Sequence, residues 1–169
     1  MSALAGWREP TSLLPLRWGT YRGRYLAGLA LIVGGMLCVA GADTHKIPML
    51  LLGTIGHVTG WFILPAGGAR RLWAVGPSLA AAWILLTGPQ SLWILIPPYL
   101  GWLLVRSRPL RSYITVLVII ANAVATAHVF HEYTDMPAAL GISAVVLTGS
   151  AWLARWIAGI GRIPRRLRA

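Results

Sequence analysis

A histidine at the centre of a long apolar stretch is the first residue of this sequence whose chemistry needs an explanation. His57 lies near the middle of residues 47–65, where ionisable groups are rare and costly if the stretch crosses a membrane. Gly53 and Gly60 lie four residues before it and three residues after it. Gly56 and Gly60 also form a small-x-x-x-small step, a glycine face that lets another helix backbone approach closely, and His57 is expected to project at the same seam. The imidazole is therefore predicted to be neutral and to point into a packed helix seam.

An amide and a pair of prolines lie at a similar depth in other apolar stretches. Asn122 is near the middle of residues 113–131, and Thr115 and Thr126 share its helical stripe, so this stripe is predicted to face protein. Pro97 and Pro98 fall in the middle of residues 91–105 and are predicted to interrupt the helix there.

Two interpretations of these residues are open. In one, a midplane binding site is formed by His57, Asn122, Thr148, Pro97 and Pro98, because transporters bind their substrates at broken helices. In the other, His57 and Asn122 hydrogen-bond to neighbouring helices and only hold the bundle together. The apolar stretches contain no acidic residue, so a transporter of this kind would lack the usual proton-coupling carboxylate.

A second polar cluster lies at the end of the fifth apolar stretch. His128, His131 and Glu132 have the spacing i, i+3, i+4 and would share one face of a continuous helix. Imidazole and carboxylate groups bind zinc and copper, so these three residues are candidate metal ligands. A solvated polar helix end explains the same residues without a metal.

Other catalytic patterns are missing from the sequence. Ser78, Ser143 and Ser150 have no histidine and aspartate nearby along the chain, and neither phosphate-binding loops nor paired carboxylates occur. His57 and His128 differ in depth by roughly 10 Å, which excludes a haem bridged by this pair. We therefore predict no catalytic residue and no cofactor.

The elements that must position these residues are six apolar stretches. The chain is 57% hydrophobic and 11% charged, whereas soluble proteins have roughly 25% charged residues. A helix needs about 20 residues to cross a bilayer and tolerates about 17, so the stretch 91–105 is expected to begin within the preceding turn. The six predicted spans are residues 25–42, 47–65, 72–88, 91–105, 113–131 and 137–157.

The connections between these spans are short, so consecutive helices should be antiparallel neighbours. The sequence thus predicts an all-α, polytopic membrane protein with six transmembrane helices in three antiparallel hairpins. They form one transmembrane domain, residues 25–157, between a basic N-terminal segment, residues 1–24, and a basic C-terminal tail, residues 158–169.

Charge determines the predicted orientation. Fourteen of the fifteen basic residues fall on one side of the six-span pattern, and three of the four acidic residues fall on the other. Short basic loops stay in the cytoplasm, so both termini are predicted to be cytoplasmic. A composition rich in Ala, Gly and Arg with one Lys suggests a bacterial source, and hence the bacterial inner membrane.

The net charge of +11 has a simple explanation in this setting. Basic residues beside a membrane are attracted to the anionic cytoplasmic leaflet, so no nucleic acid is expected as a partner. The side chains expected to contact lipid headgroups are Arg17, Arg22, Arg24, Arg162, Arg165, Arg166 and Arg168. Tryptophans mark the membrane interfaces, except Trp83, which is expected to pack inside.

These observations favour a non-catalytic accessory or assembly subunit of a larger bacterial inner-membrane complex. Its expected partners are the lipid bilayer and either other subunits or further copies of the same chain. The first alternative is a small transporter or solute-binding protein that uses the site around His57 and Asn122. The second alternative is a metal-binding membrane protein that uses His128, His131 and Glu132.

Overall fold

A computed structural model describes residues 11, 18–42, 45–66 and 69–159 of the chain. All regular elements in these residues are helical, so the predicted all-α class is confirmed. The elements are α1 Tyr21–Ala40, α2 Ile47–Ile63, α3 Arg70–Ile84, η2 Leu85–Thr87, η3 Pro89–Leu95, α4 Ile96–Val105, η4 Leu110–Thr115, α5 Val116–Val129, η5 Tyr133–Asp135 and α6 Met136–Gly159, where η denotes a 3-10 helix.

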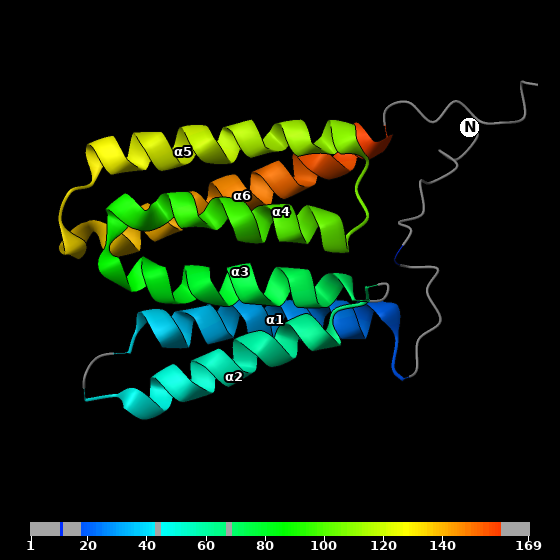
Figure 1. Ribbon diagram of the computed structural model, residues 1–169, viewed down its shortest axis with the longest axis horizontal. Coiled ribbons are helices and arrows are strands. Elements are labelled where there is room, and N and C mark those ends of the chain that lie inside the picture. The colour runs from blue at the N-terminus through cyan, green and yellow to red at the C-terminus, as the bar shows by residue number, and fades with distance from the viewer. Residues whose placement is uncertain (1–10, 12–17, 43–44, 67–68, 160–169) are drawn as a thin grey trace, which may run out of the picture.

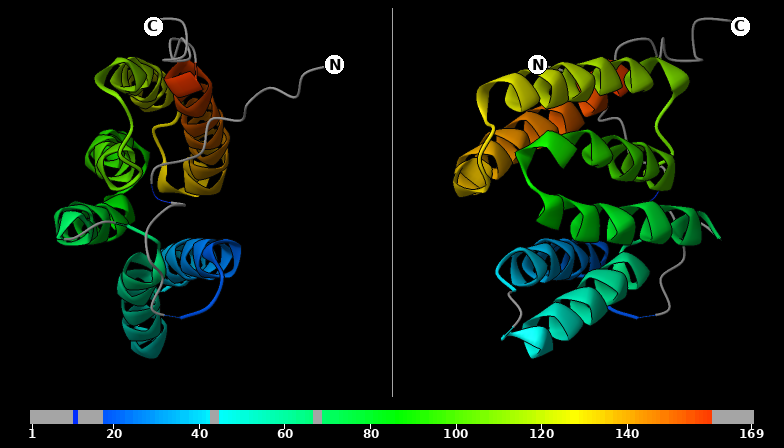
Figure 2. Two further views of the ribbon diagram at one scale, coloured as in Figure 1. Left: turned by 90° about the vertical axis from the view of Figure 1, so that its right-hand side faces the viewer. Right: turned by 60° about the vertical axis from the view of Figure 1, so that its left-hand side comes forward.

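The long helices lie side by side along the long axis of the molecule (Figure 1). α1 packs against α2, α3 packs against α4, and α5 packs against both α6 and η3. The end-on view shows α1 and α2 at one extreme of the bundle, α5 and α6 at the other, and α3 and α4 between them (Figure 2). The chain therefore builds two helix pairs that are separated by a third pair.

Among the residues that the structure describes, three helical stretches are long and apolar enough to cross a membrane: Tyr21–Ala40, Leu110–Val129 and Tyr133–Gly159. α2 is a shorter apolar helix of 17 residues. Large apolar side chains are exposed on every long helix, for example Leu26, Leu52, Leu117 and Val145. Such extensive apolar exposure suggests a membrane protein.

The region around Pro97 and Pro98 is a junction between two helix types. The helical path of this segment begins at Pro89 with η3, within the preceding turn as expected, and becomes α-helical at Ile96. Both prolines fall in the first turn of α4, where a backbone N–H has no partner inside that α-helix. The predicted interruption is thus a change from 3-10 to α-helix.

α4 ends in a turn that is stabilised by two backbone hydrogen bonds. Ser107 has a positive φ of 51°, and its N–H bonds to the carbonyl of Leu104. The N–H of Arg108 bonds to the carbonyl of Leu103, which completes a Schellman motif. Pro109 follows and prevents the helix from continuing.

The tryptophan expected inside the bundle is not the one that the fold buries. Trp83 is 44% exposed, and Trp61 is 3% exposed. Trp61 belongs to a core cluster with Leu64 and Val105. The expectation for Trp83 was wrong because depth along a helix does not determine which face of the helix packs against protein.

Candidate functional site

The contact between α1 and α2 is built on two pairs of glycines. A Cβ atom added at Gly35 would lie 2.5 Å from the carbonyl oxygen of Gly53, and one at Gly60 would lie 2.6 Å from that of Gly28. Gly28 and Gly35 are seven residues apart on α1, as are Gly53 and Gly60 on α2. The two backbones therefore touch, as the predicted glycine face requires.

His57 lies between these glycine pairs, at the seam of α1, α2 and α3. Its side chain is completely buried, with 0% exposure. Its Nδ1 atom is 3.1 Å from the backbone carbonyl oxygen of Ile32 on α1. Because a carbonyl oxygen only accepts hydrogen bonds, Nδ1 carries the proton and donates it to Ile32.

The other nitrogen of the imidazole accepts hydrogen bonds from α3 and from its own helix. Nε2 is 2.7 Å from Ser78 Oγ and 3.3 Å from Trp61 Nε1. The indole N–H of Trp61 also lies 3.1 Å from Ser78 Oγ. Since an indole N–H only donates, Nε2 is the acceptor and the imidazole is neutral, as the sequence predicts.

The network is closed on the α4 side by aromatic rings. The ring of Trp61 meets Trp102 edge-on at 6.4 Å between centroids, and Trp102 in turn packs on Tyr25 at 6.1 Å. Every polar atom of the His57 ring is thus satisfied by a protein group, and neighbouring side chains seal the ring from its surroundings.

The Ser78–His57 pair has the hydrogen-bond distance of a nucleophile and its general base. The Ile32 carbonyl even takes the place of the group that usually orients such a base. A substrate must reach the hydroxyl, however, and Ser78 is only 3% exposed. The arrangement therefore links α1, α2 and α3 through buried hydrogen bonds.

Ser78 and Trp61 are the members of this network that sequence reasoning missed. Ser78 lies 21 residues from His57, on another helix, so no local spacing connects them. The available signal was the small-residue stripe of Ala74, Ser78 and Ala81 on α3, all of which are buried. A lone hydroxyl within such a stripe indicates a polar partner on the facing helix.

Asn122 belongs to a separate seam between α5 and α6. Its Nδ2 atom donates to Ser143 Oγ at 2.9 Å, and the residue is half-buried. Thr115 and Thr126 are buried at 1% and 3% exposure, so the predicted protein-facing stripe is confirmed.

The structure does not bring the five residues of the predicted midplane site together. α2, which carries His57, packs on α1 and α3, whereas α5, which carries Asn122, lies at the opposite side of the bundle (Figures 1 and 2). Thr148 is exposed and bonds to the carbonyl of Ala144 on its own helix. Pro97 and Pro98 are half-buried in α4, between the two polar seams.

The outer cluster of His128, His131 and Glu132 does not share a helix face. α5 ends at Val129, and the backbone is extended at Phe130 and at Glu132, with ψ angles of 114° and 151°. Within the described part of the chain, no group of three His, Cys, Asp or Glu side chains is placed to hold a metal ion. The expectation of a common face was wrong because the helix ends before two of the three residues.

Arg24 and Arg71 form a basic cap on the C-terminal end of α2. Arg24 is 7% exposed, and its Nε donates to the carbonyl of Ile63 at 3.1 Å. Arg71 donates to the carbonyls of Phe62 and Ala66 at 2.8 and 2.9 Å. Cations stabilise the unsatisfied carbonyls at a helix C-terminus.

Arg24 was expected to contact lipid headgroups, but its side chain is buried against other parts of the protein. Its guanidinium carbon also lies 4.7 Å from the ring centroid of Trp18. Arg22 is exposed, as headgroup contact requires. The other arginines expected there lie outside the described residues: Arg17, Arg162, Arg165, Arg166 and Arg168.

Arg106 connects the end of α4 to the beginning of α1. It is 5% exposed, with its guanidinium carbon 4.7 Å from the ring centroid of Tyr25 and 5.6 Å from that of Trp102. Its NH1 donates to the hydroxyl of Tyr21 at 2.8 Å. Aromatic faces attract cations, so this contact joins the first helix pair to the central pair.

Comparison of the chain with protein-family models, with curated proteins and with solved structures finds no match.

Proposed function

We propose that this protein is a non-catalytic subunit or assembly factor of a membrane protein complex in the bacterial inner membrane. The observation that carries the proposal is the closed network around His57. The residue best suited to chemistry is fully buried, and both of its ring nitrogens are bonded to neighbouring protein groups. A solute path or an active site would need a polar group of this kind to be accessible.

The proposal includes six crossings of the membrane with both termini in the cytoplasm. Segments predicted on the cytoplasmic side bond to one another: Arg70 to Ser107, Arg106 to Tyr21, and Arg111 to the carbonyl of Ala158. Segments predicted on the outer side also meet, as when Gln90 donates to the carbonyl of His131. This sorting into two ends supports a chain that crosses six times.

Thiol labelling tests this topology. In a Cys38→Ala background, single cysteines are introduced at Leu110 and Tyr133, which are 87% and 57% exposed and lie at opposite ends of the bundle. A membrane-impermeant maleimide should label the Tyr133→Cys protein in spheroplasts, and the Leu110→Cys protein only after the membrane is permeabilised. Labelling of both proteins in sealed spheroplasts would contradict the topology.

The outward face of α6 offers a surface for a partner helix. Gly141 and Gly149 are exposed, and a Cβ atom added at either would meet nothing within 4 Å. Small residues on a lipid-facing helix let a second helix approach closely. Val145 and Trp152 on the same face are 73% and 76% exposed and would supply apolar contact.

Mass analysis of the protein, gently extracted from its native membrane, tests the subunit role. Stoichiometric partner chains are expected, and Gly149→Leu should release them by filling the open face of α6. Gly76→Leu is the matched control, because Gly76 on α3 is also exposed with nothing within 4 Å. Recovery of the chain alone, or equal losses from both variants, would contradict the proposal.

A further inference from the structure

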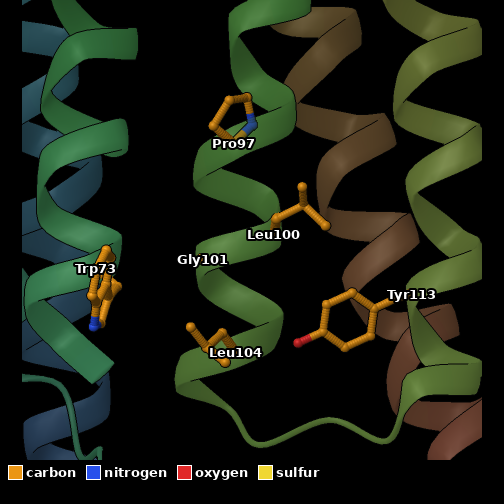
Figure 3. Close-up of a pocket in the computed structure, with 6 residues that line it drawn as sticks. All are labelled: Trp73, Pro97, Leu100, Gly101, Leu104 and Tyr113. Carbon is orange, nitrogen blue, oxygen red and sulfur yellow. The ribbon is translucent and has the colours of Figure 1, made fainter. Parts of the chain in front are cut away.

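A groove of about 390 Å³ opens on the side of the bundle where α3, α4 and η4 meet. It is lined by Trp73, Pro97, Leu100, Gly101, Leu104 and Tyr113. The lining is almost entirely apolar, with two polar atoms, the indole nitrogen of Trp73 and the hydroxyl of Tyr113 (Figure 3). Figure 3 shows this hydroxyl directed from η4 towards Leu104 on α4.

The walls of the groove come from α3, α4 and η4 (Figure 3). Gly101 is buried, and a Cβ atom there would lie 3.1 Å from the Cα and Cβ atoms of Ala74, so α3 and α4 are in close contact. The turn at Ser107 ends α4, and the chain then crosses to η4 before Tyr113 returns towards the helix (Figure 3). Leu100 and Leu104, one turn apart on α4, lie between Trp73 and Tyr113 in this lining (Figure 3).

A cationic group lies at the end of the groove where the α4–η4 connection passes. Arg70 precedes Trp73 by three residues, so the two share a helix face, and its NH1 donates to the hydroxyl of Ser107 in this connection. Its positive charge also acts electrostatically on the hydroxyl of Tyr113. A guanidinium has five N–H donors, and the bond to Ser107 uses one of them.

We propose that this groove binds one anionic phospholipid of the cytoplasmic leaflet. One of its two acyl chains lies along Leu100 and Leu104, and its phosphate is bound by Arg70 with the Tyr113 hydroxyl beside it. Arginine donates in a fork that matches phosphate oxygens, and the apolar lining suits a hydrocarbon chain. The positive charge of Arg70 favours a headgroup with a net negative charge over phosphatidylcholine, whose choline is a cation. The proposal rests on the membrane orientation proposed above and is independent of any protein partner.

The dimensions of the groove favour a lipid chain over a partner helix. From Pro97 to Leu104 it extends seven residues along α4, or about 10 Å. A transmembrane helix is about 10 Å wide and would need a contact several times longer, because it spans about 30 Å of hydrocarbon. A single acyl chain is narrower than a helix and can lie in a groove that is shallow and open along its length.

Native mass spectrometry of the purified, delipidated full-length chain tests the site. The protein is titrated with phosphatidylglycerol and with phosphatidylcholine of the same acyl chains. One phosphatidylglycerol should be retained, and Arg70→Gln should weaken its binding about tenfold, the effect of losing one charged hydrogen bond. Arg155→Gln is the control, since Arg155 is an exposed arginine on α6, away from the groove.

A second pair of variants tests the apolar part of the groove. Leu100→Trp should fill it and abolish retention of the lipid, whereas Leu117→Trp places the same bulk on an exposed part of α5 and should have no effect. Equal binding of both lipids, equal effects of the two glutamine variants, or unchanged retention by Leu100→Trp would overturn the proposal. The measurement uses the isolated chain, so loss of the proposed partner complex would leave its result unaffected.

Discussion

The two outer helix pairs of the molecule are both largely apolar and pack in different ways. Between α1 and α2 the glycines face each other, and a Cβ atom at Gly35 would lie 2.5 Å from the opposite backbone. On α6, Gly141 and Gly149 face outward into open space. The presence of glycines along a helix therefore does not tell which ones contact a neighbouring helix and which ones face outward.

The polar residues at the centres of the two pairs also differ in burial and in the number of their hydrogen-bond partners. His57 is completely buried and is bonded to groups on α1, α2 and α3. Asn122 is half-buried and donates to Ser143 on α6. Close backbone contact excludes lipid and leaves a polar side chain no alternative to a protein partner. We therefore expect the first pair to depend on its polar contacts far more than the second.

Removal of His57 and of Asn122, one at a time, should give the largest difference in unfolding free energy between the two helix pairs. His57→Ala leaves a cavity and takes the hydrogen-bond partner from Ser78 and Trp61, so the free energy of unfolding should fall by about 3 to 5 kcal/mol. Asn122→Ala should cost about 0.6 kcal/mol, the average for a hydrogen bond between membrane helices. Denaturant titration of both proteins in mild detergent measures these values, and equal losses would remove the distinction between the two seams.

A single methyl group tests the packing difference. Gly35→Ala places its Cβ against the backbone of α2 and should lower the unfolding free energy by about 1 to 3 kcal/mol, as overpacked cores do. Gly141→Ala enters open space and should raise stability by up to about 1 kcal/mol through helix propensity. Thermal unfolding of the two variants in the same detergent compares them. A stabilised Gly35→Ala protein would show that α1 and α2 do not touch at this point.

Removal of one hydroxyl from each seam should have a smaller effect. Ser78→Ala deprives the buried Nε2 of His57 of its closest donor and should cost about 1 to 2 kcal/mol. Ser143→Ala removes the acceptor of Asn122, which is partly exposed, and should cost about 0.6 kcal/mol. The same denaturant titration measures both losses of unfolding free energy. A larger loss for Ser143→Ala than for Ser78→Ala would contradict the greater dependence of the first pair on its polar contacts.

The smallest effect is expected at Thr148, which the sequence places with the polar residues and the structure places on the surface. Its hydroxyl bonds to the carbonyl of Ala144 within α6, so no other helix depends on it. Thr148→Val should change the unfolding free energy by less than about 0.5 kcal/mol. A loss comparable with that of Ser78→Ala would place Thr148 in an interhelical contact.

Several features of the candidate site could be predicted because they depend on a single helix. The burial of His57 follows from its position on the glycine face of α2, and the burial of Thr115 and Thr126 follows from the stripe on α5. The prediction that His128, His131 and Glu132 share a helix face was wrong. It required α5 to continue through Glu132, and the helix ends at Val129. The end of a helix depends on the connection that follows it and on its contacts.

By itself, the sequence determined the helical class, the apolar stretches and the asymmetry of basic residues, because each follows from composition or from spacing along one segment. The tertiary structure decided which helices meet. It chose Ser78 and Ile32 as the partners of His57, turned Arg24 and Arg71 onto the end of α2, and separated His57 from Asn122. Those contacts depend on the rotation of each helix about its axis, and that rotation is fixed only when small residues on two helices allow their backbones to approach.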